Sequence, residues 1–142
     1  MKHSSLVKVL CFSGVIPFYI LSILSFFYKN FFIFDLFSIY SLVILSFLSG
    51  STWLELILYE KEPNIKLLII TVVLTPIILI IFEIFIQAQI KIFIFGICYF
   101  GIYLIDQKFL KNLVYIRIRK NLTIQVIFCH ILVLISIYTN GF

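Results

Sequence analysis

The chain has 142 residues, of which 63% are hydrophobic and only 12% are charged. Ordinary soluble domains are about 45–50% apolar and about 25% charged, so this composition excludes a water-soluble globular domain. The net charge of +5 does not indicate nucleic-acid binding, because the basic residues stand at the ends of apolar runs and not along one polar face. The sequence predicts one all-α domain over residues 1–142, a polytopic integral membrane bundle of five transmembrane helices.

The transmembrane helices are predicted from the lengths of the apolar runs. A helix needs about 20 mainly apolar residues to cross about 30 Å of hydrocarbon. Five runs meet this requirement, at residues 6–28, 36–59, 65–86, 88–106 and 121–138. The first run has a basic start like a secretory signal, but it is too long and lacks a small-residue cleavage site, so we expect a retained anchor. Pro17 has no amide hydrogen and predicts a kink near Gly14.

The second predicted span carries hydroxyl residues and Gly50 where contact with lipid would favour leucine. About one third of its helical circumference holds Ser38, Ser41, Ser49, Thr52 and Trp53, with Ser46 at the edge. Small and hydroxyl residues let helix backbones approach closely and hydrogen-bond to one another. We therefore interpret this face as the packing surface of the central helix. Asp35 is expected to cap the first turn of this span.

The connections between the later spans differ in polarity. Pro76 predicts a second kink within the third span. Residues 107–120 form the sizeable polar stretch of the chain, and their apolar positions recur at helical spacing while the lysines point elsewhere. This pattern predicts a short basic helix that lies in the interface on anionic head groups, between the fourth and fifth spans.

Lysine and arginine are concentrated on one side of the predicted bundle. The N-terminus, the second connection and the fourth connection hold two, two and five of them, nine in all, while the other side holds Lys29 and Lys91. Basic residues accumulate on the cytoplasmic side of a membrane. We therefore expect a cytoplasmic N-terminus, an outer C-terminus, and anionic lipid as a partner at the cytoplasmic face.

Acidic residues within or near the spans are the candidates for chemistry. Glu55 and Glu83 lie near opposite ends of their spans, where an unpaired charge costs several kcal/mol. They cannot form one site, so we favour carboxylates that reach the interface or pair with a neighbour over an ion path. The topology also places Asp106 and Glu55 on the side of Arg117 and Arg119. We predict that Asp106, with Glu55 as a second candidate, pairs with one of these arginines.

Other reactive residues do not form a recognisable site. Cys11, Cys98 and Cys129 lie far apart inside apolar runs, which indicates buried free thiols. His130 points about 100° away from its neighbour Cys129, so we expect a hydrogen-bonded core histidine and not a metal ligand. The sequence contains no nucleophile elbow, phosphate loop, zinc helix or dinucleotide fingerprint.

These features favour a protein that is not an enzyme and has no cofactor. We expect it to act through membrane partners, as an assembly or scaffolding factor or in a homo-oligomer. The alternative is a small oligomeric transporter or channel, with the hydroxyl face and Glu55 or Glu83 along its path. A membrane-embedded enzyme that uses Glu55 or His130 is the third hypothesis, and no second catalytic group supports it.

A family resemblance rests on several short stretches taken together. They are Gly14-Val15-Ile16-Pro17-Phe18, Tyr40, Ser46-Phe47-Leu48-Ser49-Gly50-Ser51-Thr52-Trp53, Asp106, and the segment from Tyr115 through Arg117 and Arg119 to Thr123. In order and spacing the chain resembles the bacterial relatives of transmembrane protein 69, small integral membrane proteins classed as a domain of unknown function. The resemblance implies a bacterial inner membrane or a mitochondrial location, and no activity. Thr52 stands where family members tend to have histidine, and Val114 where they often have tryptophan.

Overall fold

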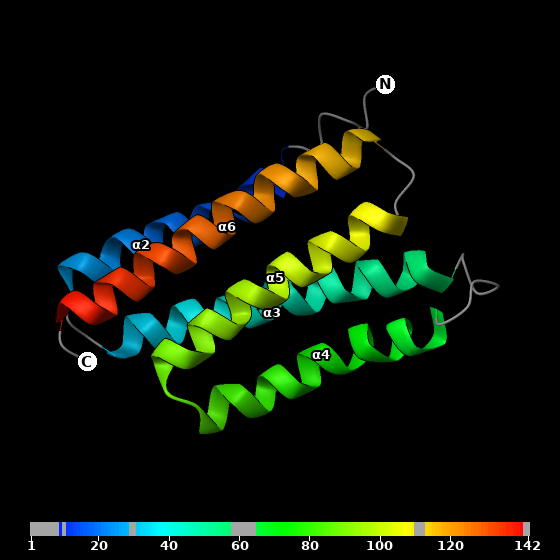
Figure 1. Cartoon of the computed structure of the whole chain (residues 1–142). Helices are drawn as coiled ribbons and strands as arrows, with labels where there is room; N and C mark the ends of the chain where they lie inside the picture. Colours follow the sequence, from blue (N-terminus) through cyan, green and yellow to red (C-terminus); the bar gives the residue numbers. More distant parts are fainter. Residues whose placement is uncertain (1–8, 10, 29–30, 58–64, 110–112, 141–142) are drawn as a thin grey trace.

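The computed structural model describes residues 9, 11–28, 31–57, 65–109 and 113–140, and in this part of the chain it is helical throughout apart from short turns. The helices are α2 (Ile16–Phe27), α3 (Phe31–Ile57), α4 (Ile65–Phe85), α5 (Ala88–Phe109) and α6 (Leu113–Asn140), and successive helices run in alternating directions (Figure 1). Four are long and apolar enough to cross a membrane: α3, α4, α5 and the part of α6 at Val114–Thr139. The all-α class is therefore confirmed, with four candidate spans and one shorter apolar helix at Cys11–Phe27.

Four helices form a closed ring, and the fifth packs on its outside. α2 contacts α3 and α6, and α5 contacts the same two helices. α4 packs along α3, with a smaller contact to α5, and lies at the edge of the bundle (Figure 1). In its most apolar 18-residue window, 11% of the residues are buried, against 28% in α3 and α5 and 39% in α6. The core of the protein therefore lies inside the ring, and α4 presents most of its surface outward.

The helix around Pro17 is interrupted where a kink was predicted. Residues 11–13 are helical, Gly14 and Val15 form a turn, and α2 then begins at Ile16 with Pro17 in its first turn. Tyr40 of α3 donates a hydrogen bond to the Gly14 carbonyl at 2.8 Å. A neighbouring helix thus supplies a donor to the backbone at the break, as apolar surroundings require. The predicted first span at residues 6–28 lies partly outside the described residues, and the described helix is shorter.

α3 begins earlier than predicted. The helix starts at Phe31, so Asp35 lies inside it, and the predicted capping role of Asp35 is wrong. Phe34 and Phe37 are 1% and 0% exposed. Burial of these aromatic side chains stabilises the extra turn of helix. The Asp35 carboxylate pairs with Lys91 of α5.

The predicted interfacial helix between the fourth and fifth spans is wrong. α5 continues to Phe109, and α6 runs without interruption from Leu113. Residues 110–112 lie outside the described part of the chain. Arg117 and Lys120 are exposed, whereas Arg119 between them is only 5% exposed and contacts Asp106. An ion pair within the bundle makes this polar segment the first turns of the last span.

Pro76 affects the contact between α3 and α4. A proline inside a helix has no amide hydrogen and leaves the carbonyl four residues earlier, here that of Val72, without its helical partner. Ser49 of α3 donates its hydroxyl hydrogen to this Val72 carbonyl. The buried hydroxyl therefore replaces the missing hydrogen bond, which is how membrane helices accommodate proline.

We expect Ser49→Ala to lower the free energy of unfolding by about 1 kcal/mol, because it leaves a buried carbonyl unpaired. In a Pro76→Ala background the new amide can bond to Val72, so the same substitution should cost clearly less. Unfolding by sodium dodecyl sulfate in mixed micelles, followed by circular dichroism, measures both values. Ser46→Ala is the control, because this hydroxyl bonds to Leu42 of its own helix. Equal costs of Ser49→Ala in the two backgrounds would contradict the assignment.

Candidate functional site

Polar side chains of α3 reach the other helices at three levels of the bundle. Ser38, Ser41, Ser49 and Thr52 are all buried, at 0–2% exposure, and recur at spacings of three, eight and three residues. This spacing places them on one face of the helix, as predicted. At the end where α3 begins lies the acid–lysine cluster: Asp35, Ser38, Glu83 and Lys91. At the middle level lies the ring cluster: Phe18, Phe37, Tyr99 and His130. At the other end lies the Asp106 cluster: Ser51, Thr52, Asp106 and Arg119.

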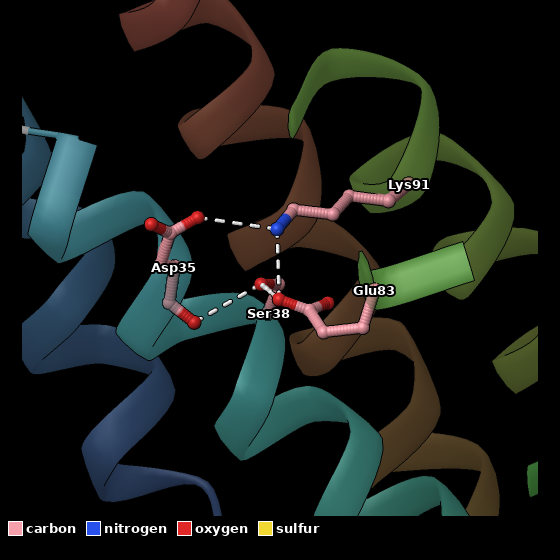
Figure 2. Close-up of polar contacts among 4 residues, drawn as sticks. All are labelled: Asp35, Ser38, Glu83 and Lys91. Atoms are coloured by element: carbon pink, nitrogen blue, oxygen red, sulfur yellow. Dashed lines mark hydrogen bonds and ion pairs between the residues drawn. The ribbon is translucent and has the colours of Figure 1, made fainter. Parts of the chain in front are cut away.

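The acid–lysine cluster joins three helices through one ammonium group. Lys91 Nζ of α5 lies 3.1 Å from Asp35 Oδ1 of α3 and 2.7 Å from Glu83 Oε1 of α4. Ser38 donates to the same Glu83 oxygen at 2.7 Å, and Figure 2 shows the amine between the two carboxylates. The side chains of Lys91 and Glu83 are 5% and 15% exposed, whereas that of Asp35 is 54% exposed. The two partners of Lys91 therefore differ sharply in solvation.

A cavity of about 550 Å³ adjoins this cluster and is lined by Asp35, Glu83 and Lys91 together with residues of the α4–α5 turn. Glu83 Oε2 is buried and makes no hydrogen bond to the described residues. The sequence indicated Glu83 as a carboxylate that pairs with a neighbour, and this pairing is present. Lys91 lies inside α5, which begins three residues earlier.

Each of the four helices α2, α3, α5 and α6 contributes one aromatic side chain to the ring cluster. His130 lies 4.9 Å from Phe37, 5.4 Å from Tyr99 and 5.8 Å from Phe18, measured between ring centroids. All four side chains are at most 2% exposed. Three of the rings meet His130 from different helices, so this level of the bundle is filled by packed rings.

Hydrogen bonds define the state of His130. Its Nδ1 lies 2.8 Å from the Val126 carbonyl, which can only accept, so Nδ1 carries the hydrogen. Nε2 then accepts from the Ser41 hydroxyl at 3.0 Å. Tyr99 donates to the Ser41 carbonyl at 3.0 Å, which adds α5 to the same contact. Nε2 thus bonds to α3 and Nδ1 to the backbone of its own helix, as expected for a hydrogen-bonded core histidine.

The Asp106 cluster contains the predicted carboxylate–arginine pair. Arg119 Nη2 lies 2.9 Å from Asp106 Oδ2, without the alignment of a hydrogen bond, and donates to Ser51 at 2.8 Å. Thr52 donates to Asp106 Oδ1 at 2.7 Å. Asp106 and Arg119 are 3% and 5% exposed, so this is a buried ion pair that joins α3, α5 and α6.

Other residues predicted near this cluster lie around it. The Arg119 guanidinium carbon lies 5.5 Å from the centroid of the Tyr115 ring, within cation–π distance. Arg117 is exposed, and the buried pair uses Arg119 instead. Glu55 is half-buried, and no ion pair of Glu55 is found within the described residues.

The predicted packing face is only partly the observed one. Trp53 is 36% exposed and stands off the buried face. A Cβ atom added to Gly50 would meet Trp53 Nε1 of the same helix at 3.9 Å and no neighbouring helix, so close helix approach at Gly50 is wrong. Ser51, which the prediction left off this face, contacts Arg119. The observed face therefore differs from the predicted one, and the sequence around Ser51 carried no signal for its contact with Arg119.

Few groups in the described part of the chain are arranged for metal or thiol chemistry. Among these residues, no group of three or more His, Cys, Asp or Glu side chains is placed to hold a metal ion. Cys129 is buried, whereas Cys11 and Cys98 are half-buried, and all three are free thiols.

Four long apolar helices, joined internally by buried polar contacts, define a multi-pass membrane protein. Residues 4–135 match the family described as Protein of unknown function (DUF3429), and the chain belongs to this family. Neither the curated proteins nor the solved structures contain a match to the chain.

Proposed function

We propose that this DUF3429 protein is not an enzyme and acts through other membrane proteins, as an assembly or scaffolding factor. The observation that carries the proposal is the use of the buried polar groups. At each level they bond from helix to helix, as in Lys91–Glu83, Ser41–His130 and Thr52–Asp106. The outer faces of the helices are then the surfaces through which the protein acts.

α4 is the helix best placed to meet a partner. It lies outside the ring and buries 11% of the residues in its most apolar window. Thr71 and Thr75 donate to carbonyls of their own helix at 2.9 and 2.8 Å, so their hydroxyls leave the outer face apolar. Ile77 and Ile81 are 53% and 50% exposed on this helix. A partner helix can pack here without competing with any contact of the ring.

Site-specific photo-crosslinking tests the proposal. A photo-reactive residue at Ile77 or Ile81 should yield a defined product with a different membrane protein, which also co-purifies in stoichiometric amounts in mild detergent. Ile20 and Ile23 of α2, which are 52% and 53% exposed, are the matched controls and should give a lower yield of this product. Products with lipid or with a second copy of this chain alone would refute the proposal.

The alternative function is a small oligomeric transporter or channel. The cavity at the acid–lysine cluster would be one mouth of its path. The packed rings of Phe18, Phe37, Tyr99 and His130 fill the next level of the same bundle, and this weighs against a path through one copy. Ion or substrate flux into liposomes that contain the purified protein would favour this alternative.

We also propose kinship with transmembrane protein 69, a bacterial inner-membrane location and a cytoplasmic N-terminus. The described basic residues support the orientation, because Lys66, Lys108, Arg117 and Lys120 are exposed at the Asp106-cluster end. At the other end Lys91 is outnumbered by Asp35 and Glu83. A reporter fused after Phe142 should be active outside the cytoplasm, and activity inside would refute the orientation.

A further inference from the structure

A second cavity, of about 140 Å³, lies between α2, α3 and α6 beside the Asp106 cluster. Its lining on α6 extends from Tyr115 through Arg119 to Val126, a stripe about 16 Å long at 1.5 Å per residue. Phe18 and Leu48 are among the apolar residues that line it from α2 and α3. Cavities of about 150 Å³ hold one benzene molecule in other proteins, so this space suits a segment of an alkyl chain.

Arg119 gives the cavity a polar end. The guanidinium has five N–H donors, and its polar contacts with Asp106 and Ser51 are both made by Nη2. Arg119 is only 5% exposed. Its Nε atom is buried and has no hydrogen-bond partner among the described residues. A buried donor without a partner is rare in folded proteins. A ligand oxygen at the polar end of the cavity would supply the missing acceptor.

The charges at this end select the ligand. Asp106 offsets the charge of Arg119, whereas Lys108 and Lys120 are exposed at the same end of the bundle. Exposed basic residues near a membrane surface attract anionic head groups. Phe47, which lines the cavity, is itself 74% exposed, so the cavity opens toward the lipid-facing side of α3.

We propose that this cavity binds a segment of one acyl chain of an anionic phospholipid, whose head-group or ester oxygen accepts a hydrogen bond from Arg119. The apolar lining receives this segment, the exposed Lys108 and Lys120 attract the phosphate, and Arg119 fixes the depth of the lipid. This site is independent of the proposed partner surface, because it lies between α2, α3 and α6 and not on α4.

Native mass spectrometry of the full chain from a neutral detergent tests this site. Titration with phosphatidylglycerol should give one retained lipid, with at least about tenfold higher affinity than phosphatidylcholine of the same acyl chains. Equal affinity for the two lipids would overturn the proposal. Glycerol phosphate, which has the head-group charge without a chain, should not compete, and competition would identify a site for phosphate alone.

Two variants separate the cavity from general surface attraction. Arg119→Lys keeps a cation opposite Asp106 but removes the guanidinium, and should weaken phosphatidylglycerol binding about tenfold. Arg117→Lys is the matched control on the exposed face and should leave binding nearly unchanged. Ile44→Trp fills the cavity from α3 while Arg119 stays intact, and it too should remove the bound lipid. Equal effects of the two arginine substitutions, or full binding by a folded Ile44→Trp protein, would overturn the proposal.

Discussion

Replacement of Arg119 by alanine is expected to lower the free energy of unfolding by about 3–5 kcal/mol, because it leaves the Asp106 carboxylate buried without its counter-charge. Asp106 is 3% exposed and, among the described residues, retains only its hydrogen bond from Thr52. The substitution also removes the contact of α6 with Ser51 of α3. Unfolding by sodium dodecyl sulfate in mixed micelles, followed by circular dichroism, measures the loss.

Two further variants determine whether the pair is responsible. Arg117→Ala removes an exposed arginine from the same helix and should cost less than about 1 kcal/mol. The double variant Asp106→Leu/Arg119→Met replaces the ion pair by apolar side chains and should recover more than half of the loss. If Arg119→Ala is no more harmful than Arg117→Ala, the buried pair does not stabilise the bundle.

Lys91→Met is expected to have the second largest effect, a loss of about 3 kcal/mol. Glu83 would then keep a charge at 15% exposure with only the Ser38 hydroxyl as a described partner. The end of α4 would also lose its ionic contact with α5. The same detergent titration measures the loss, and Glu83→Gln added to Lys91→Met should restore a part of it.

The exposure of the two carboxylates predicts unequal roles. Asp35 is 54% exposed, so Asp35→Asn should cost less than about 1 kcal/mol. Lys108→Met replaces an exposed lysine of α5 and is the control for Lys91→Met. A loss from Asp35→Asn as large as that from Lys91→Met would show that Glu83 is not the main partner of the lysine.

Much of the architecture follows from the sequence alone. Long apolar runs predict the positions of α4 and α5 to within a few residues, because a hydrocarbon layer needs a minimum helix length. The hydroxyl residues from Ser38 to Thr52 predict a face of α3 that packs on other helices. The pairing of Asp106 with an arginine follows from the high cost of an isolated charge in the membrane.

The tertiary structure decided which faces of the helices meet. In a soluble protein, polar outer residues mark the surface, but here exposed and buried positions are both apolar, so periodicity does not separate them. Trp53 therefore lay within the predicted packing face although it is exposed, and Lys91 gave no sign that it is buried between Asp35 and Glu83. The continuity of α6 likewise depends on Asp106, which stands 13 positions before Arg119 and on another helix. The sequence by itself determined the membrane class, the helices and the cost of each buried charge; only the packing of helix on helix decided which partner each charge received.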